Sequence, residues 1–563
     1  MWQRTFGRWG DPATPVTVKP GGERFIAETL GIPVPRPAVD PSTIQAPASR
    51  LTGDDITALA AFLGLANVDT SRAARLQHAA GCSLGDYVDQ RDAALRGVPD
   101  AVVRPASHAE VQQVVATCSD RDVAVVPFGG GTSVVGGVTP LAGDHRGVVV
   151  VDLTRMIEVL HIDETSGLAV VQPGVTGPML ERLLEPRGLT WGHLPQSWER
   201  ATIGGYAATR SAGQASSGFG RSDDTIEAVR MATPAGEVRL GRAPASAAGP
   251  DLRQLVIGSE GVLGVVTEVT LRLRRRRAWE RYEGLLVPSF AAGVEALREI
   301  TQSGLQATVM RLSDEAETRS TLAMSGPSGP AGAALRRYLR SRGVDGGCLM
   351  VLGWEGASAD VGRARRKAAW QVLDRHGAVG LGQRIGESWR SHRFSGPFLR
   401  DVLLDRGYIV ETVETATHWS GLLALHADLT VGLDAALRTS SGGRAFVMTH
   451  VSHVYDTGAS LYVTALAPAQ ADRRAQWWAA KSAASEVVTA AGATITHHHA
   501  VGTDHLPWMA SEVGDLGLAA LRAVKDAWDP AGVLNPGKLI PARPIPAASS
   551  RTLGDGSVAG VSR

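Results

Sequence analysis

The sequence predicts an α+β protein of two or three domains. Its 563 residues exceed what one ordinary hydrophobic core accommodates. Three glycine-rich loops stand beside β-rich segments, at 127–133, 202–205 and 258–264. From about 280 to 496, apolar strands alternate with helical segments. This alternation indicates a second α+β domain after the glycine-rich part.

The first 97 residues are predicted to form an arm and a helical region. Residues 1–50 are rich in Pro and Gly, which favours an extended arm that wraps a larger body. Segments 54–63, 72–80 and 84–96 have the apolar spacing of helices. We therefore expect small helices here rather than a separate sheet.

The loop at 127–133, Pro-Phe-Gly-Gly-Gly-Thr-Ser, predicts a diphosphate-binding turn after the strand 123–126. Consecutive glycines let the backbone approach a ligand closely, and the N–H and hydroxyl groups bind anions. Upstream, Ser107 and Glu110 have the spacing of a capping box for a helix over 111–121. A lone glycine-rich turn can be only a tight turn. Three such loops together can hold one long cofactor.

The loop pattern excludes the doubly wound dinucleotide fold. That fold needs G-x-G-x-x-G at the start of a helix, with an acidic residue roughly 20 positions later. Residues 134–138, Val-Val-Gly-Gly-Val, are instead expected to be extended. The ordered loops resemble the FAD-binding domain of the vanillyl-alcohol-oxidase superfamily, over about 101–273 and 529–538. The fold expected is a two-part FAD-binding domain of that type with an inserted α+β substrate (cap) domain.

The resemblance implies non-covalent FAD, with the diphosphate in the first loop and the ribityl chain and ring along the later loops. Oxidases of the superfamily often tether FAD through His or Cys, but Thr132 follows the three glycines here and Cys118 is in a helix before the loop. The residues implied to bind FAD are Pro127, Phe128, Gly129, Gly130, Gly131, Thr132, Ser133, His193, Gln196, Thr202, Gly204, Gly205, Thr209, Arg210, Ser211, Ala212, Glu260, Gly261, Val262, Leu263, Gly264, Val265 and Val266.

Composition restricts the partners and the compartment. A net charge of +1 argues against nucleic acid, whose phosphates need a basic field. Cys82, Cys118 and Cys348 form neither a disulfide framework nor a metal pattern, which suits a reducing cytosol. The N-terminus has no secretion signal, and no stretch approaches the roughly 20 apolar residues that span a bilayer. We expect a cytoplasmic protein that is at most peripheral at a membrane.

His497, His498 and His499 form the second strong signal. In an extended chain His497 and His499 share one face and His498 points to the other. Burying three imidazoles is costly unless each is hydrogen-bonded, so acid–base chemistry or phosphate binding is favoured. A surface strand and a metal site are the alternatives. We predict no metal, because adjacent positions do not converge on one ion and no nearby Cys or Asp completes a set.

The histidine run, followed by Ala-Val-Gly and preceded by Gly-Ala-Ser-Leu-Tyr at 458–462, resembles the alkyldihydroxyacetonephosphate synthase family. The similarity runs from about Trp9 to Leu539 and includes 203–205 and 311–314. It implies that a fatty alcohol replaces the acyl chain of acyl-dihydroxyacetone phosphate, giving an ether lipid precursor without net oxidation. The alternatives are an FAD-linked oxidase or dehydrogenase of a 2-hydroxy acid, and a non-catalytic flavoprotein.

The resemblance also implies roles for single residues. Tyr462 matches the catalytic tyrosine beside the flavin, and Arg400 the arginine that binds the released carboxylate. Arg311 matches an arginine needed for an intact site, with a structural salt bridge an equal alternative. One imidazole of 497–499 is the base and the others hold phosphate. The alternative for Tyr462 is an ordinary core residue, and composition alone favours a surface position for Arg400.

Two segments depart from the family pattern, 410–415 and the ending 534–538. The cap domain is expected to contain strands at 282–287, 347–354 and 459–466 and helices at 291–302, 361–376 and 469–491. The predicted domains are 1–97, the arm and helical region; 98–278, the FAD-binding domain; 279–496, the substrate (cap) domain; 497–541, a C-terminal return to the active site and flavin domain; and 542–563, a disordered tail.

Membrane contact is expected to be peripheral, because the implied substrates are lipids. The four arginines at 274–277 are either a solvated strand end or a patch that faces anionic lipid heads. Trp389 and Phe394 are the candidates for apolar contact, with an ordinary loop as the alternative. A homodimer is the protein assembly that we consider.

Overall fold

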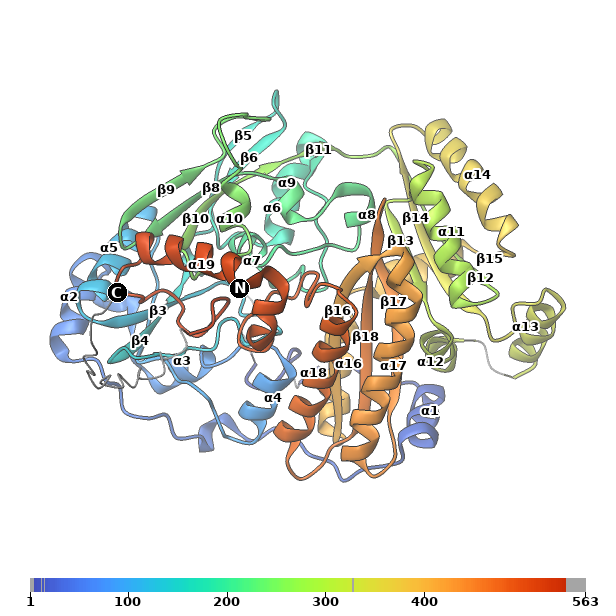
Figure 1. The fold of residues 1–563 in the computed structure, drawn as a ribbon, viewed down its shortest axis with the longest axis horizontal. Helices are drawn as coiled ribbons and strands as arrows, with labels where there is room; N and C mark the ends of the chain where they lie inside the picture. The colour runs from blue at the N-terminus through green and yellow to red at the C-terminus, as the bar shows by residue number, and fades with distance from the viewer. Residues whose placement is uncertain (1–4, 12, 15, 327–328, 543–563) are drawn as a thin grey trace, which may run out of the picture.

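A computed structural model describes residues 5–11, 13–14, 16–326 and 329–542 (Figure 1). The molecule has two halves. Residues up to about 278 and the C-terminal segment form one half, and residues from about 279 to 490 form the other (Figure 1). Sheets and helices are mixed in both halves, as expected of an α+β protein. The predicted tail 542–563 lies, apart from its first residue, outside the described residues.

The N-terminal region is not a simple extended arm, because residues 20–30 form a helix with Pro20 in its first turn and Gly31 at its end. This helix, α1, packs against α12 (Glu315–Ser325) of the other half. The chain then returns to the first half, where Ser83 caps α4 in a complete capping box. The helices here are α1 (Pro20–Leu30), α2 (Gly53–Leu63), α3 (Arg72–Gln77) and α4 (Leu84–Arg91), and the strand is β1 (Val68–Asp69).

The first glycine-rich loop follows β3 at the edge of a four-stranded sheet of order β1-β2-β4-β3. Strands β3 and β4 run parallel, and Ser107 caps the helix α5 that precedes β3. The chain beyond Ser133 turns at Gly136, which has a φ of +69°, so the expected extended run over 134–138 is wrong. The elements are β2 (Ala101–Val103), α5 (His108–Asp120), β3 (Val123–Phe128) and β4 (Gly147–Asp152).

The second and third glycine-rich loops border a five-stranded antiparallel sheet of order β5-β6-β10-β8-β9. Thr202 caps α7 by accepting from the N–H of Gly205. The strands are β5 (Val159–Asp163), β6 (Leu168–Val171), β7 (Leu189–Thr190), β8 (Ile226–Thr233), β9 (Gly236–Leu240), β10 (Val265–Arg272) and β11 (Arg274–Arg275). The helices are α6 (Gly177–Leu184), α7 (Ile203–Thr209), α8 (Ser216–Phe219), α9 (Ser222–Thr225) and α10 (Arg253–Val256).

The second half is built on a seven-stranded antiparallel sheet of order β15-β12-β14-β13-β17-β18-β16. Helices α11, α14, α17 and α18 cover one face and bury most of the apolar core (Figure 1). The strands are β12 (Trp279–Val287), β13 (Val309–Ser313), β14 (Cys348–Gly356), β15 (Val379–Gly382), β16 (Tyr408–His418), β17 (Phe446–Tyr455) and β18 (Gly458–Pro468). The helices are α11 (Phe290–Gln302), α12 (Glu315–Ser325), α13 (Gly329–Ser341), α14 (Ala359–Arg375), α15 (Gln383–His392), α16 (Gly396–Asp405), α17 (Trp419–Ser441) and α18 (Arg473–Ala490).

Helix α17 is long and apolar enough to cross a membrane by length and composition. The sequence-based expectation that no segment meets this test is therefore wrong. Its fully buried side chains, Leu422, Leu425, Leu429, Leu433 and Leu437, recur every three or four residues. They pack in the core beneath the sheet, which accounts for the apolar character of one face.

The C-terminal segment returns to the first half. Helix α19 (Met509–Trp528) lies across it, and Leu534 then pairs with Val125 of β3 (Figure 1). The side chain of Asn535 donates to the carbonyls of Gly137 and Glu260, at 3.1 and 2.6 Å. The last described residues thus connect the first glycine-rich loop to the third.

Candidate active site

One cavity of about 1070 Å³ lies between the two halves. Its first wall consists of the three glycine-rich loops, and its second wall is the sheet face opposite α17 and α18. Residues from α1, α12, α13, α15 and α16 close its sides. Most of the predicted cofactor and catalytic residues therefore come together at one site.

The glycine-rich loops pack so closely that side chains are excluded. A Cβ on Gly129 would lie 2.3 Å from Thr202 Oγ1, and one on Gly130 would lie 2.1 Å from the carbonyl oxygen of Arg200. A Cβ on Gly261 would meet the ring of Pro127 at 2.7 Å. The three loops, distant in sequence, thus form a continuous surface of backbone and hydroxyl groups.

Most of the residues predicted to bind FAD line this wall. They are Pro127, Phe128, Gly129, Gly130, Gly131, Thr132, Ser133, Gln196, Thr202, Gly204, Gly205, Thr209, Ser211, Ala212, Glu260, Gly261, Gly264 and Val266.

Five others do not reach the cavity. Val262, Leu263 and Val265 are buried in the cores behind the loops. His193 lies behind Ser211, whose hydroxyl contacts its Nε2 at 3.1 Å. Arg210 holds the third loop through the carbonyl of Ile257.

The loop wall fits a diphosphate group. Its backbone N–H groups and the hydroxyls of Thr132, Ser133 and Thr202 are neutral donors. The one carboxylate at this wall among the described lining residues, Glu260, accepts from the N–H groups of Val501 and Gly502, at 2.8 Å each. Burial raises its pKa to about 7, which favours its neutral form. None of the three cysteines is among the cavity-lining residues described.

The histidine run is wrapped around a buried carboxylate that the sequence analysis did not assign. Glu414 Oε1 accepts from the N–H groups of His497, His498 and His499 at 3.0, 2.7 and 2.7 Å, and from the hydroxyl of Thr496 at 2.8 Å. The run is therefore a turn and not an extended strand. His498 and His499 both line the cavity and His497 does not, so the predicted alternation of faces is wrong.

Charge at the histidine turn is concentrated on Glu414. Burial alone would raise the pKa of Glu414, but the imidazoles of His498 and His499 hold it well below its ordinary value. Burial lowers the pKa of both His497 and His499 to about 3. The turn thus combines a carboxylate with two imidazoles, those of His497 and His499, that are neutral near pH 7.

The histidine cluster has the composition of a metal site in two overlapping sets of residues, one with His453, His497 and His498 and one with Glu414. Glu414, His498 and His499 bring their ligand atoms within 4.8 Å of one another. The expectation that no nearby Cys or Asp completes a set does not cover Glu414, a carboxylate that is distant in the sequence. However, Glu414 Oε1 already accepts four hydrogen bonds, and Oε2 contacts His498 Nδ1 at 3.1 Å. This carboxylate organises the turn.

Tyr462 lies at the centre of the second wall. It is paired with Glu414 across β16 and with His450 across β17. Its ring stacks on His450 with centroids 4.9 Å apart and lies 5.7 Å from His499. Burial raises the pKa of its hydroxyl, which therefore stays protonated. The tyrosine is thus placed in the cavity beside the histidine turn.

Arg311, on β13, faces the same wall. Its Nη2 donates to Glu317 at 2.9 Å and contacts His450 Nδ1 at 3.1 Å. Arg311 thus makes a salt bridge with Glu317 while still lining the cavity. Both sequence-based interpretations of this residue are compatible with its position.

Arg400, on α16, is inside the protein and lines the cavity. Its guanidinium lies 4.5 Å from the ring centroid of Tyr87 and donates to the carbonyl of Cys82 at 3.0 Å. The Nε donor is buried and has no hydrogen-bond partner within the described part of the chain. A guanidinium with an unused donor suits a carboxylate ligand.

Comparisons with known proteins agree with this arrangement. A model of FAD binding domains matches residues 99–241, and a model of the C-terminal domain of FAD linked oxidases matches residues 276–539. The alkyldihydroxyacetonephosphate synthase of Dictyostelium discoideum is 32% identical over 514 residues, which cover 90% of this chain and 84% of that protein. The chain belongs to the alkyldihydroxyacetonephosphate synthase family. FAD is its cofactor, as predicted.

Other relatives support the family and the fold. The Trypanosoma brucei brucei alkyldihydroxyacetonephosphate synthase is 34% identical and covers 84% of this chain and 78% of its own length. A solved alkyldihydroxyacetonephosphate synthase structure is 28% identical, covers 95% of this chain and 98% of its own, and superposes with a TM-score of 0.82. A p-cresol methylhydroxylase structure, 15% identical, covers 89% and 98% with a TM-score of 0.64 and shares the fold alone.

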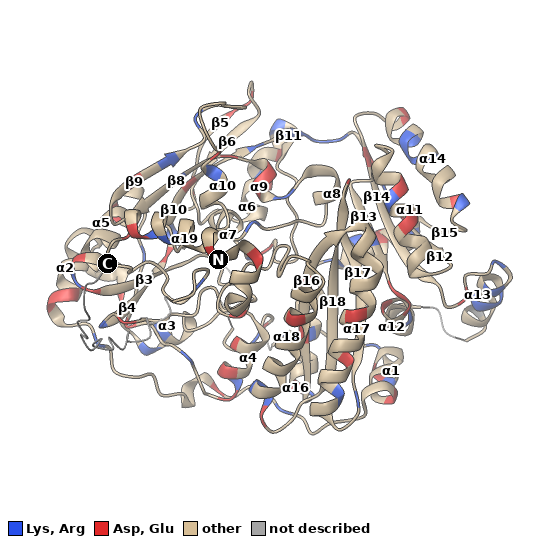
Figure 2. Ribbon diagram, viewed as in Figure 1, with Lys and Arg blue, Asp and Glu red and all other residues tan. Residues whose placement is uncertain are grey.

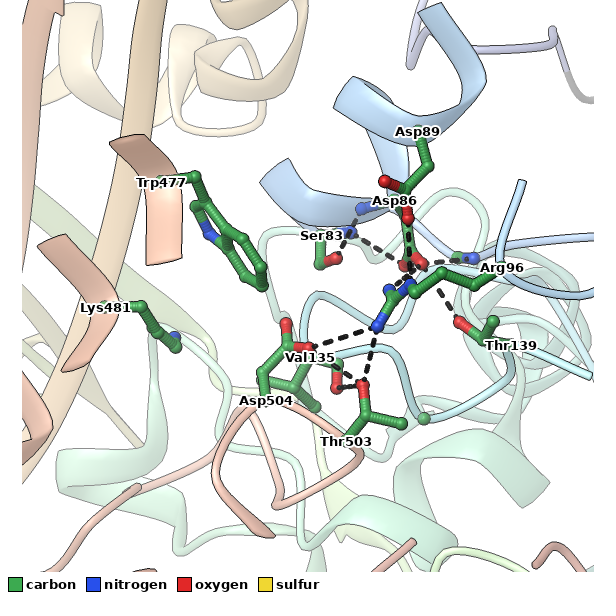
Figure 3. Close-up of polar contacts among 12 residues, drawn as sticks. Ser83, Asp86, Asp89, Arg96, Val135, Thr139, Trp477, Lys481, Thr503 and Asp504 are labelled. Atoms are coloured by element: carbon green, nitrogen blue, oxygen red, sulfur yellow. Dashed lines mark hydrogen bonds and ion pairs between the residues drawn. The ribbon is translucent and has the colours of Figure 1, made fainter. Parts of the chain in front are cut away.

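Within this family member, an ionic network outside the cavity contacts the segment that follows the first glycine-rich loop, at Val135 and Thr139 (Figure 3). Arg96 donates to Asp86 and Asp89 at 2.9 and 2.8 Å and to the hydroxyl of Thr503 at 3.2 Å. Asp504 lies 4.0 Å from Arg96, and burial raises its pKa to about 6. The network connects α4 to the segment after the histidine turn. Its members are far apart in sequence, and no motif marked them.

Proposed function

We propose that this protein is an FAD-dependent transferase that exchanges the acyl chain of acyl-dihydroxyacetone phosphate for a fatty alcohol. In this reaction the bond between the dihydroxyacetone carbon and the ester oxygen breaks, and the fatty acid leaves as a carboxylate. The alcohol oxygen takes its place, and the alcohol proton is released. Nothing is oxidised overall. Bound FAD supplies an electron sink for this chemistry.

The observation that carries the proposal is a polar centre between two apolar regions of one cavity. Arg311, His450 and Tyr462 stand on the neighbouring strands β13, β17 and β18. On the β12–β14 side the cavity is lined by Leu286, Leu335, Leu339, Leu349 and Leu381. On the β16–β18 side it is lined by Phe25, Leu30, Leu403, Val410, Phe446 and Leu466. An amphiphile with a phosphate head and a long chain suits this distribution.

The residues around the polar centre have roles that follow from their chemistry. Arg400 binds the departing carboxylate, because its fork offers parallel donors. His498 presents Nε2 to the cavity, since its Nδ1 contacts Glu414, and takes a proton from the substrate. Tyr462 donates or holds a proton beside it. His499 and Arg311 face the phosphate head.

The competing function is the oxidation of a 2-hydroxy acid. Such a substrate has the carboxylate that Arg400 suits but no long chain to fill either apolar region. A D-lactate dehydrogenase of Arabidopsis thaliana is 26% identical, below the synthases. The cavity and the relatives therefore favour the transferase.

One assay separates the two functions. The holoenzyme is incubated with acyl-dihydroxyacetone phosphate and radiolabelled hexadecanol, and the products are treated with base. We expect a labelled lipid that survives base, because an ether resists hydrolysis that cleaves the ester. Absence of that product, together with lasting bleaching of the flavin absorption by a 2-hydroxy acid without oxygen, would establish the oxidase instead.

Peripheral membrane contact and a cytoplasmic location are part of the proposal. Trp389 and Phe394 are poor membrane contacts, because they stack on Tyr282 and Trp198. Exposed apolar side chains at the cavity edge offer a better one, namely Val16, Leu322 and Ile385, at 39%, 41% and 39% exposure.

Basic residues at this edge supplement the apolar contact. Helix α13, whose inner side lines the cavity, carries the exposed Arg336, Arg337 and Arg340 (Figure 2). Arg274 and Arg276 are already engaged by Phe219 and Glu185. Each well-placed arginine contributes about 1 kcal/mol at an anionic surface.

Vesicle co-sedimentation tests the membrane proposal. We expect salt-sensitive binding to anionic vesicles that weakens in an Arg336→Gln, Arg337→Gln double variant but not in Arg275→Gln. Equal binding of all three proteins would contradict the role of α13.

A homodimer is proposed through the outer face of α17, where Leu423 and Val431 are 37% and 69% exposed. Sedimentation velocity of the holoenzyme tests it. A monomer at micromolar concentration would contradict it, and a Val431→Glu variant is expected to dissociate the dimer.

A further inference from the structure

His497 is separated from the cavity although its two neighbours line it. Its ring nitrogens have defined contacts: Nδ1 lies 3.0 Å from His498 Nδ1, and Nε2 lies 2.6 Å from the hydroxyl of Tyr455. His498 in turn makes its ring contacts through Nδ1, which leaves Nε2 for the cavity. Three side chains thus form one hydrogen-bonded line that starts at the cavity.

The last side chain of this hydrogen-bonded line, Tyr455, belongs to a second pocket of the molecule. Tyr455 is the last residue of β17, at a hairpin whose next two residues are exposed. It lines a second pocket of about 430 Å³, whose rim includes the exposed His418, Thr457 and Glu512. Tyr455 thus contacts the histidine turn through its hydroxyl and also lines a pocket that reaches solvent.

Two arrangements of protons satisfy the contacts among His498, His497 and Tyr455, and only the first also keeps the His498 Nδ1–H bond to Glu414. In the first, His498 Nδ1–H faces Glu414 and His497, and His497 Nε2–H donates to the oxygen of Tyr455. In the second, the hydroxyl of Tyr455 donates to His497 Nε2, His497 Nδ1–H donates to His498 Nδ1, and His498 carries its proton on Nε2. Each neutral imidazole accepts at one nitrogen and donates from the other. Moving from the first to the second carries one proton from the cavity to the far side of Tyr455.

We propose that His498, His497 and Tyr455 form a proton-exit path from the active-site cavity to the second pocket. This inference rests on the proposed function, because that reaction releases one proton per turnover. The alcohol proton enters at His498 Nε2, and the proton on His498 Nδ1 passes to His497 Nδ1. The proton on His497 Nε2 then passes to Tyr455, whose hydroxyl proton leaves to water in the pocket. No electrons move, and no group besides the proton is transferred.

The surroundings keep this path in the neutral, switchable state that it needs. Burial lowers the pKa of His497, so this ring exchanges protons without remaining charged. Burial also raises the pKa of the Tyr455 hydroxyl. Glu414 holds the backbone of the turn in place. The titratable and charged groups that face the path are Glu414, His453, His499, His193, Arg221, Asp223 and Asp224.

The path is tested with Tyr455→Phe in the holoenzyme, which removes the terminal hydroxyl and keeps the ring. We expect kcat to fall on the order of 10- to 100-fold with KM unchanged, and the D₂O effect on kcat to increase, because proton exit becomes limiting. Imidazole buffer in the second pocket is expected to restore kcat in proportion to its concentration. Tyr408→Phe is the control, since it also loses one hydroxyl hydrogen bond, to the carbonyl of Gly31, away from the histidines. That control should show neither effect.

The outcomes separate the path from the proposed function. Ether formation by the wild-type enzyme decides the function. A Tyr455→Phe enzyme with wild-type kcat, D₂O effect and buffer response would overturn the path while the function stands. Imidazole ¹⁵N shifts, assigned through His497→Gln, give a readout independent of turnover. If the path exists, the His497 ring carries one proton, and the tautomer of His497 changes when Tyr455 is replaced by Phe. An unchanged tautomer in Tyr455→Phe would overturn the path, even if that enzyme is inactive.

Discussion

The two walls of the cavity are built from opposite kinds of chemistry. The loop wall consists of glycine backbone and hydroxyls, and its carboxyl Glu260 has a raised pKa. The sheet wall gathers imidazoles, a tyrosine and an arginine around the carboxylate of Glu414. The loop wall binds a large anionic cofactor through close backbone approach. The sheet wall binds the charged groups of the substrate and transfers protons. Substitutions in the two walls should therefore fail in different ways.

The largest effect is expected at the loop wall. Gly130→Asp should abolish FAD binding, because its Cβ would lie 2.1 Å from the carbonyl oxygen of Arg200 and its carboxylate would oppose the diphosphate. The measurement is flavin absorbance after gel filtration, with Gly53→Ala as the control because no atom lies within 4 Å of its Cβ position. Acid precipitation of the wild type should release all flavin, and yellow pellets would contradict non-covalent binding.

Tyr462→Phe tests the sheet wall without disturbing the loop wall. The ring still stacks on His450, so FAD content and fold should be retained. Turnover should fall by roughly 10²- to 10⁴-fold, the usual range for a lost proton-transfer group. Steady-state rates and flavin spectra check this. Near-normal rates would mean that Tyr462 is only a core residue.

Glu414→Gln tests whether one carboxylate organises the histidine turn. An amide oxygen cannot replace both carboxylate oxygens, so several buried N–H groups lose a charged acceptor, at a cost of about 1–3 kcal/mol. We expect a lower thermal midpoint, retained FAD and turnover reduced more than the midpoint alone explains. Glu414→Asp keeps the charge, but its shorter side chain does not reach all three N–H groups. We therefore expect Glu414→Asp to recover less than half of the turnover that Glu414→Gln loses. Full activity of Glu414→Gln would refute this role.

Arg400→Lys separates charge from geometry. Lysine keeps the charge but not the planar fork, so a carboxylate loses one charge-assisted hydrogen bond, which is about 1.5–3 kcal/mol. We expect a 10- to 100-fold weaker inhibition by fatty acid product, close to the effect of Arg400→Ala. Inhibition constants for palmitate measure this. Wild-type inhibition of the lysine variant would show that charge alone is sufficient.

The smallest expected effect is a change of folding stability with pH. It comes mainly from histidines of the sheet wall. His193, His497 and His499 have pKa values of about 3 when folded, and about 6.5 is usual when unfolded. Between these values the unfolded chain binds more protons, so stability falls on acidification by up to about 1.4 kcal/mol per pH unit per histidine. Glu260 and Asp504, with pKa values of about 7 and about 6, act in the opposite sense and lose stability as pH rises from about 4.

Thermal midpoints between pH 7.5 and 5.0 measure the balance. We expect a decline below pH 6.5, with a shallower slope in His497→Gln. A midpoint that rises steadily toward pH 5.0 would show that the two carboxyl groups outweigh the histidines.

The loop wall was accessible to sequence reasoning because its requirements are local. Three consecutive glycines, a capping threonine at 202 and a third glycine-rich turn are visible in the chain itself, and the fold brings these segments together. His193 and Arg210 were assigned to FAD by resemblance, yet they support the loops from behind. Whether a residue of a motif reaches the cavity depends on tertiary packing, which the motif itself does not specify.

The sheet wall was less accessible because its geometry is set by distant residues. His497, His498 and His499 were recognised, but their orientation depends on Glu414, 83 to 85 residues upstream. The signal that could have revealed Glu414 is the placement of Glu411 and Glu414 in an otherwise apolar strand. Buried carboxylates there need partners, and a strand next to Tyr462 brings the histidines to them.

The pairing of Val125 with Val533 and of Asn535 with Glu260 has a consequence for synthesis of the protein. The surface that receives FAD is complete only when the last part of the chain has left the ribosome, since Thr503 and Asn535 close it. Contacts separated by about 400 residues form slowly. A nascent chain that ends near residue 495 therefore carries the loops and most of the sheet, but lacks the segment that fixes them. We therefore expect stable binding of the cofactor only after the segment around Asn535 has joined the fold.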